Sequence, residues 1–274
     1  MINFKHKPVL LDECIEGLNI KPEGIYVDGT LGGAGHSKVI VSKLSTKGKL
    51  IGIDRDTDAL KAAKENLNKY TNIKYIHDNH DNIKSILNNL KIDEVDGILL
   101  DLGVSSFQLD EKSRGFSYIG ENELDMRMDK GQELTAKKIV NSYSEEELAR
   151  IIFEYGEEKF SRNIAKNICL YRKTKEIETT KELVKIIEDS IPKSKQKDGH
   201  PAKRTFQAIR IEVNDELHPL YNTVRDCIDC LKPGGRLCII TFHSLEDRVV
   251  KQAYIDAVRK MHMPTRITLL CMQL

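Results

Sequence analysis

The strongest constraint on the fold lies between residues 24 and 54, where a glycine-rich turn separates two short apolar runs that each end in an aspartate. The first run, Ile25-Tyr26-Val27, leads into Asp28, and four glycines follow within the next seven residues. A segment with helical spacing then precedes the second run, which ends in Asp54. Strand, glycine turn, helix, strand and acid, in that order, are typical of a nucleotide-binding βαβ unit.

The residue types of this turn indicate what kind of ligand it would bind. Glycines let the backbone approach a ligand closely, because no Cβ stands in the way. Asp54, 19 residues after Gly35, is expected to accept hydrogen bonds from the hydroxyls of a ribose. The spacing is not the G-x-G-x-x-G of dinucleotide enzymes, and an acid before the glycines, Asp28, suits a cationic ligand such as S-adenosylmethionine. A tight turn without a ligand is the alternative, and the two flanking acids argue against it.

Length and composition limit the remaining classes. A chain of 274 residues can bury a large core in one or two domains, and with a net charge of +1 any nucleic-acid interface must be a local patch. The six cysteines are too scattered for a disulfide scaffold, and Cys227-x-x-Cys230 has no second pair that would complete a zinc site. No membrane span or signal peptide is evident, so we expect a cytoplasmic protein without a bound metal.

Apolar patterns predict the domain organisation. Further strands are expected at residues 73–77, 96–102 and 236–242, and one helical pattern separates neighbouring strands except between the last two, where a much longer segment lies. That gap of some 130 residues is too long for one parallel crossover, so only its last part, a helix from Thr205 to Leu231, is expected to be the crossover. We therefore predict an α/β sheet domain from residues 1–106 and 205–274, with an inserted all-helical domain at residues 107–204.

The predicted insertion contains two helix starts and one basic segment. Ser144-x-x-Glu147 is typical of a capping box, and Glu182 is the expected partner of a second cap at Thr179 or Thr180. Cations then concentrate between residues 193 and 204. A solvated loop is the ordinary interpretation of such a run, but its position before the crossover helix favours phosphate binding by a set of four side chains: Lys195, Lys197, Lys203 and Arg204.

Polar residues follow the last two predicted strands. Asp101 ends the fourth strand and Ser105 lies just beyond it, while His243 follows the fifth. Ligands of such sheets bind beyond the carboxyl ends of the strands, so these side chains are expected at the reacting centre. Ser244 is expected to cap the next helix with Asp247 as its partner, an arrangement that leaves His243 unexplained.

Several strings along residues 4–255 resemble one family closely. They include VDGTLGGAGHS (27–37), DGILLDLGVSSFQLD (96–110), YGEEKFSRNIA (155–165), HPAKRTFQAIRIEVN (200–214) and GGRLCIITFHSLEDR (234–248). The chain is similar to small-subunit rRNA methyltransferase H, the 16S rRNA (cytosine(1402)-N4)-methyltransferase family. The resemblance implies a Rossmann-like class I methyltransferase sheet, an inserted domain for rRNA recognition, and transfer from S-adenosyl-L-methionine to a cytidine of the small ribosomal subunit.

The resemblance also implies positions for the cofactor. They are Ala34, Gly35 and His36 in the turn, Asp54 at the ribose, His80 beside the adenine, and Asp101 and Gln108. The exocyclic amine of cytosine is a weak nucleophile, so a side chain must accept its proton, and we rank Asp101, Ser105 and His243 in that order. Alternatively, Asp101 does not accept the proton and only orients the methionine part of the cofactor.

The last residues depart from the family pattern. After about residue 257 the sequence lacks the segment that in the family supplies a final β-hairpin, so we expect a truncated end and an exposed sheet edge. The sequence is also compatible with three other functions: a methyltransferase with DNA or a small molecule as acceptor, an NAD-dependent oxidoreductase, and a catalytically inactive RNA-binding assembly factor. The oligomeric state and any requirement for an assembled subunit are not predicted.

Overall fold

The structure, a computed structural model, describes residues 8–196 and 199–261. The chain divides into two compact units. The first unit comprises Met1–Ser105 and Leu217–Leu274, and the second comprises Ser106–Glu216.

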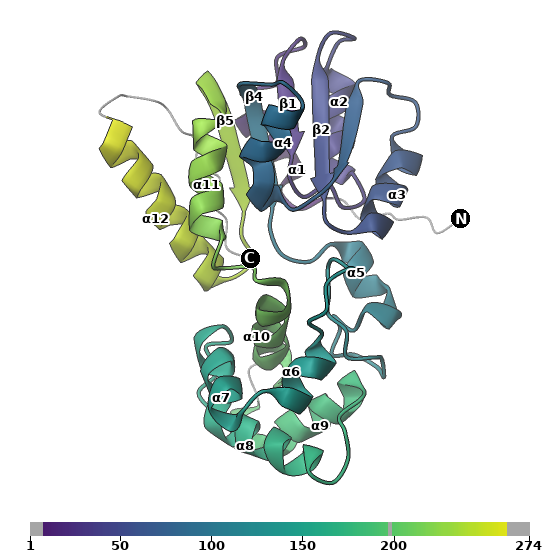
Figure 1. The fold of residues 1–274 in the computed structure, drawn as a ribbon, viewed down its shortest axis with the longest axis vertical. Coiled ribbons are helices and arrows are strands. Elements are labelled where there is room, and N and C mark those ends of the chain that lie inside the picture. Colours follow the sequence, from purple (N-terminus) through teal and green to yellow (C-terminus); the bar gives the residue numbers. More distant parts are fainter. Residues whose placement is uncertain (1–7, 197–198, 262–274) are drawn as a thin grey trace. The chain divides into compact units, whose positions relative to one another are not determined.

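The first unit is built on a five-stranded parallel sheet (Figure 1). Its strand order is β3-β2-β1-β4-β5, so the order reverses between β1 and β4. Because these two neighbouring strands are followed by connections that leave in opposite directions, a crevice is expected beyond their carboxyl ends. The strands are β1 (Ile25–Asp28), β2 (Lys49–Asp54), β3 (Ile73–His77), β4 (Val95–Asp101) and β5 (Leu231–Ile240).

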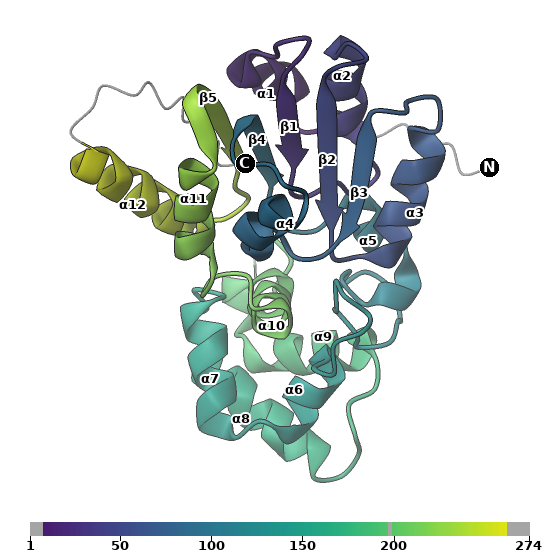
Figure 2. The same ribbon diagram turned by 45° about the horizontal axis from the view of Figure 1, so that its top comes forward.

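Helices cover both faces of this sheet (Figure 2). Two separate apolar clusters lie between the sheet and its helices, one on each face. The interior strand β4 is buried along its length except at Asp101, as expected for a strand packed on both faces. One face carries α1 (Leu11–Leu18), α2 (Gly35–Lys43) and α3 (Thr57–Asn66), and the other carries η1 (His80–Asn82), α4 (Ile83–Asn89), α11 (Leu220–Asp229) and α12 (Ser244–Met261).

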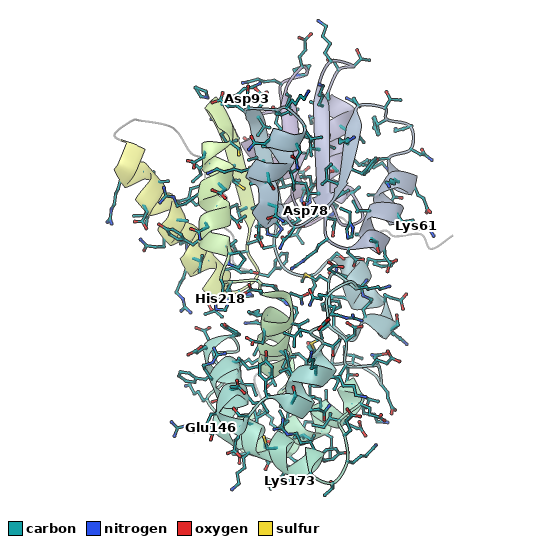
Figure 3. All side chains as sticks on the ribbon, viewed as in Figure 1. Lys61, Asp78, Asp93, Glu146, Lys173 and His218 are labelled. Atoms are coloured by element: carbon teal, nitrogen blue, oxygen red, sulfur yellow. The ribbon has the colours of Figure 1, made fainter. Side chains whose placement is uncertain are left out.

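The two ends of the strands differ in what their acids do. Asp93 and Asp78 mark these ends in Figure 3: Asp93 precedes β4 at the amino edge, and Asp78 follows β3 at the carboxyl edge. At the amino edge Asp96 is 6% exposed and accepts hydrogen bonds from Lys21 Nζ, Lys232 Nζ and the backbone N–H of Ile25. Although burial alone would raise it, these bonds lower the pKa of Asp96 to about 2. Its carboxylate thus ties the starts of β1, β4 and β5 together.

The regular secondary structure in the described part of the second unit is helical, apart from one isolated bridge between Glu123 and Thr179. Both capping boxes form as predicted, with Ser144 and Glu147 at the start of one helix and Thr179, rather than Thr180, with Glu182 at the start of another. The elements are α5 (Ser106–Asp110), η2 (Lys112–Arg114), α6 (Ala136–Ser142), α7 (Glu145–Glu154), α8 (Ser161–Arg172), α9 (Thr180–Ser190), η3 (Lys193–Lys195) and α10 (Lys203–Asn214).

A long irregular segment of the second unit, between η2 and α6, is fixed by buried polar side chains. Arg114, only 2% exposed, donates to the carbonyls of Arg127 and Met128. Asn214 donates to the Met126 carbonyl and accepts from the Met128 N–H. These bonds satisfy backbone groups that no helix or sheet pairs, which explains how the chain around Met126 and Met128 can be buried.

The predicted class, a Rossmann-like class I methyltransferase sheet with an inserted helical part, is confirmed, but the single crossover helix expected from Thr205 to Leu231 is wrong. The chain instead forms α10 and α11, separated by five residues. Asp215 ends α10 in the left-handed region at φ 48°, and Pro219 precedes α11. The division between the units accordingly falls after Glu216 rather than after residue 204. No helix within the described residues is long and apolar enough to cross a membrane.

Candidate active site

The glycine turn after β1 is held by the carboxylate of Asp28. This side chain is 1% exposed and accepts hydrogen bonds from Ser37 Oγ at 2.6 Å and from the Thr30 N–H at 3.2 Å. Asp28 therefore braces the turn from inside, a role different from the contact with a cationic ligand that the sequence suggested. Packing also requires two of the glycines, because a Cβ at Gly29 would lie 2.4 Å from Leu100 Cδ2 and one at Gly35 would lie 2.4 Å from Pro8 Cγ.

Asp54 ends β2 and connects the turn to the next strand. Its Oδ2 accepts from the Gly32 N–H at 2.7 Å, and its Oδ1 accepts from the Asp56 N–H at 2.8 Å. Burial raises the pKa of Asp54 to about 6, although both of these bonds lower it. Each oxygen of a carboxylate has about two acceptor positions, so one position per oxygen is available for a ribose hydroxyl.

His80 lies just after β3, in η1, on the side of the glycine turn. Its Cβ is 3.1 Å from the position that a Cβ on Gly29 would take. Burial lowers the pKa of His80 to about 4, although Asp81, whose Oδ1 lies 3.6 Å from His80 Nε2, raises it. The ring is therefore neutral at neutral pH, and a neutral imidazole can stack against an adenine.

Asp101 ends β4, beside the start of α2. Its backbone N–H donates to Thr30 Oγ1 at 2.6 Å, and its Oδ2 lies 3.7 Å from His36 Nδ1. The Oδ1 atom is buried and has no hydrogen-bond partner among the described residues. Burial raises the pKa of Asp101 to about 6; His36 lowers it, and the negative charges of Asp28 and Glu246 raise it further. His36 Nε2 lies 2.9 Å from the Val9 carbonyl, so this ring links α2, β4 and the segment before α1.

His243 precedes α12, which begins at Ser244. The cap expected at Ser244 with Asp247 stays a prediction, and a further contact joins His243 to Glu246. The Glu246 N–H donates to His243 Nδ1 at 3.4 Å, and Glu246 Oε2 accepts from the Phe242 N–H at 2.8 Å. Sequence reasoning missed Glu246, which is 1% exposed, although its position three residues after His243 matches the spacing of a cap and its partner.

The other predicted residues fall into two groups. Ser105 lies in the first unit, with its Cβ 3.7 Å from the position of a Cβ on Gly32, and so adjoins the turn. Gln108 lies on α5 of the second unit and is 5% exposed, so its cofactor contact stays a prediction. Lys195, Lys203 and Arg204 are exposed on the second unit, where Arg204 donates to the Glu157 carbonyl, and Lys197 lies outside the described residues.

The first unit fits an adenosyl group carrying a sulfonium on three observations. Asp54 keeps acceptor positions for a ribose, His80 offers a neutral ring next to the turn, and Asp101 has a buried oxygen without a partner in the described part of the chain. Asp54 and Asp101 end strands and His80 follows β3, so all three lie at the carboxyl edge of the sheet, and Asp101 flanks the reversal of strand order. This is the position at which open α/β sheets bind nucleotides.

Comparisons with known proteins agree with this geometry. The model of the MraW methylase family matches residues 3–274. The chain belongs to the MraW methylase family. It is 62% identical over 250 residues to the ribosomal RNA small subunit methyltransferase H of Clostridium botulinum, covering 91% of this chain and 81% of that one. The protein of the same name from Lachnospira eligens is 59% identical over 256 residues, covering 93% and 81%.

Similarity to solved structures is far weaker. A SAM-dependent O-methyltransferase from Thermotoga maritima shares 17% identity with a TM-score of 0.31, covering 37% of this chain and 38% of that one. Membership in the MraW methylase family makes this chain a methyltransferase whose cofactor is S-adenosylmethionine, which confirms the cofactor expected from the glycine turn. It also removes the oxidoreductase alternative.

Proposed function

We propose that this MraW-family methylase transfers a methyl group to N4 of a cytidine, position 1402 in the usual numbering, in 16S rRNA of the small ribosomal subunit. The observation that carries the proposal is the Asp101 carboxylate at the carboxyl end of β4, whose buried Oδ1 has no partner among the described residues. Relatives also support the proposal: proteins that are 59–62% identical over nine tenths of this chain are named ribosomal RNA small subunit methyltransferase H.

The bound cofactor supplies an electrophilic methyl group, and the chain must make the amine able to attack it. The lone pair of the cytosine amine is delocalised into the ring, so attack is favoured when an acceptor takes up an amine proton. An ionised Asp101 is such an acceptor, since burial keeps water from its Oδ1 and no donor of the described residues occupies that atom. Ser105 and His243 are the other candidates, and both adjoin the same edge of the sheet.

The RNA is proposed to be held by the second unit. Lys195, Lys203 and Arg204 are exposed there, and with Lys197 they would contact phosphates and position the rRNA strand. The target base must leave its stack to reach a buried carboxylate, which costs a few kcal/mol unless the base is already unpaired.

Product analysis tests this proposal. The purified chain is incubated with tritiated S-adenosylmethionine and small subunits from a strain that lacks the modification, and the labelled rRNA is digested to nucleosides. We expect N4-methylcytidine as the labelled product. A 2′-O-methyl or ring-carbon product would contradict the N4 assignment, and label in DNA but not in rRNA would favour the alternative acceptor. Cofactor binding without any transfer would favour an inactive assembly factor.

A matched variant tests the cofactor site separately. Asp54→Ala removes the proposed ribose acceptor, and two charge-assisted hydrogen bonds contribute about 1.5–3 kcal/mol each, so the cofactor affinity should fall at least tenfold in a calorimetric titration. Glu65→Ala, at an exposed position of α3, removes an equal charge as the control and should bind the cofactor normally. A decrease below about threefold in Asp54→Ala would contradict the ribose role.

A further inference from the structure

Two buried side-chain atoms of the first unit have no hydrogen-bond partner among the described residues: Asp101 Oδ1 and His243 Nε2. Buried polar groups are nearly always paired, and an unpaired one destabilises the fold unless a ligand completes it. The two residues also lie at the ends of neighbouring strands, since Asp101 ends β4 and His243 follows β5. Asp101 stands opposite Ile240 in the register of β4 and β5, and His243 follows Ile240 by three residues. The two unpaired atoms, Asp101 Oδ1 and His243 Nε2, therefore belong to residues at the same edge of the sheet.

The two atoms have opposite hydrogen-bonding character. Ionised Asp101 can only accept. His243 Nδ1 accepts the Glu246 N–H, so the neutral ring carries its proton on Nε2 and can only donate there. Glu246 Oε1 lies 3.2 Å from Nε2 without the alignment of a hydrogen bond, and its negative charge favours this protonated nitrogen. Glu246 is itself fixed by the Phe242 N–H, so it acts as a positioning residue for the His243 ring.

We propose that Asp101 and His243 read the edge of the target base as an acceptor and a donor. Asp101 accepts an N–H of the exocyclic amine, and His243 Nε2–H donates to the unprotonated ring nitrogen beside that amine. This inference rests on the proposed function. Cytosine presents such an edge at N4 and N3, as adenine does at N6 and N1. Uracil and guanine present the reverse order, a carbonyl beside a ring N–H. Their carbonyl would face the Asp101 carboxylate, two acceptors, and their ring N–H would face His243 Nε2–H, two donors.

The same geometry separates the roles of the two residues. With Nδ1 committed to the helix and Nε2 protonated, His243 has no lone pair with which to take the amine proton. Asp101 retains that role, and its side chain is 26% exposed although Oδ1 is buried. A rotation about χ2 exchanges the two oxygens, so the carboxylate can present either one to an incoming base.

A substrate analogue tests the donor contact directly. Small subunits are reconstituted with 16S rRNA that carries cytidine or 3-deazacytidine at the target position; the analogue keeps the amine and replaces N3 by C–H. We expect the wild type to bind the analogue subunits about 5- to 150-fold more weakly and to show a lower kcat/KM, because His243 Nε2–H is left without an acceptor.

A variant separates this contact from changes in amine reactivity. His243→Ser keeps a capping oxygen for α12 but cannot reach the base. For each enzyme, the discrimination ratio is kcat/KM with cytidine subunits divided by kcat/KM with 3-deazacytidine subunits. The intrinsic reactivity of the two bases affects wild type and variant equally. Dividing the wild-type ratio by the variant ratio therefore isolates the contribution of the His243 contact. His243→Ser should discriminate by less than about twofold while melting close to the wild type. Glu246→Gln, which keeps an acceptor for Phe242, should show intermediate discrimination.

The outcomes distinguish this inference from the proposed function. If the wild type forms N4-methylcytidine on ordinary subunits but binds and methylates the 3-deaza subunits equally well, the inference alone fails. It also fails if His243→Ser discriminates as strongly as the wild type. If no N4-methylcytidine forms on ordinary subunits, the proposed function fails and this inference fails with it.

Discussion

At the scale of single residues, Gly33 and Gly35 lie two positions apart in one turn but differ in their surroundings. A Cβ at Gly33 would meet nothing within 4 Å, whereas one at Gly35 would lie 2.4 Å from Pro8 Cγ. Gly35 also begins α2, whose next residue, His36, contacts the Val9 carbonyl and approaches Asp101. A change at Gly35 is therefore transmitted to the candidate site.

We predict that Gly35→Ala lowers the free energy of unfolding by about 1–3 kcal/mol, the usual range for an overpacked site. It should also weaken cofactor binding, because the displaced Pro8 segment holds His36. Gly33→Ala is the matched control and should keep the free energy of unfolding. Thermal unfolding and a calorimetric titration with S-adenosylhomocysteine measure the stability and the cofactor affinity. Equal behaviour of the two variants would show that the contact with Pro8 does not constrain the turn.

Sequence reasoning located several site residues because position on a strand decides where they lie. Asp54 and Asp101 each end a strand, and parallel strands bring their carboxyl ends to one edge. The partners of these residues could not be read in the same way. The contact between the Glu246 N–H and His243 Nδ1 depends on where α12 begins, and the sequence pattern does not fix that start to one residue. Asp28 looked like a ligand contact, and its burial becomes evident only with the bond to Ser37.

At the scale of elements, the sheet is tied at its amino edge by Asp96. The strands themselves were predictable from their apolar runs, but β5 begins at Leu231, earlier than expected, because its first residues pair with Val95 across an irregular register. The break between α10 and α11 was missed since helical periodicity continues on both sides of it. Only the left-handed Asp215 and the following Pro219 mark the interruption.

We predict that Asp96→Ala destabilises the protein by about 1–2 kcal/mol at pH 7, the lower part of the range for a buried carboxylate, because its lysine partners remain partly exposed. The pKa of Asp96 is about 2 in the folded state against 3.8 ordinarily, so its stabilisation is complete above pH 4 and disappears as the pH falls toward 2. Urea unfolding at both pH values tests this, with exposed Asp93→Ala as the control. A difference from wild type that persists unchanged at pH 2 would contradict the ionic role.

At the scale of the whole molecule, a net charge of +1 means that RNA affinity cannot come from the overall charge. It must come from a local set of cations, and Lys203 and Arg204 at the start of α10 are two of its proposed members. Other lysines of the second unit are already neutralised by acids. Lys181 pairs with Glu121 and Lys185 pairs with Asp189.

We predict that replacing Lys203 and Arg204 by Gln weakens binding to small subunits and lowers the slope of log affinity against log salt by about 0.7 for each phosphate that these side chains neutralise. Replacing Lys181 and Lys185 by Gln is the control with equal charge change and should leave the slope within error. Filter binding between about 50 and 200 mM salt measures both. A slope reduced equally by the two pairs would indicate general electrostatics rather than a defined phosphate site.

The most direct test of the proposed chemistry is the single-turnover rate of methyl transfer by Asp101→Asn, measured with saturating cofactor and small subunits. With cofactor saturating, the variant should transfer methyl about 100-fold or more slowly, since general-base catalysis contributes about 10²–10⁴-fold. Because the pKa of Asp101 is raised to about 6, the wild-type rate should rise as the pH increases through 6, and the variant should lack this rise. A variant with a wild-type rate, or a defect confined to cofactor affinity, would contradict the claim that Asp101 takes up the amine proton.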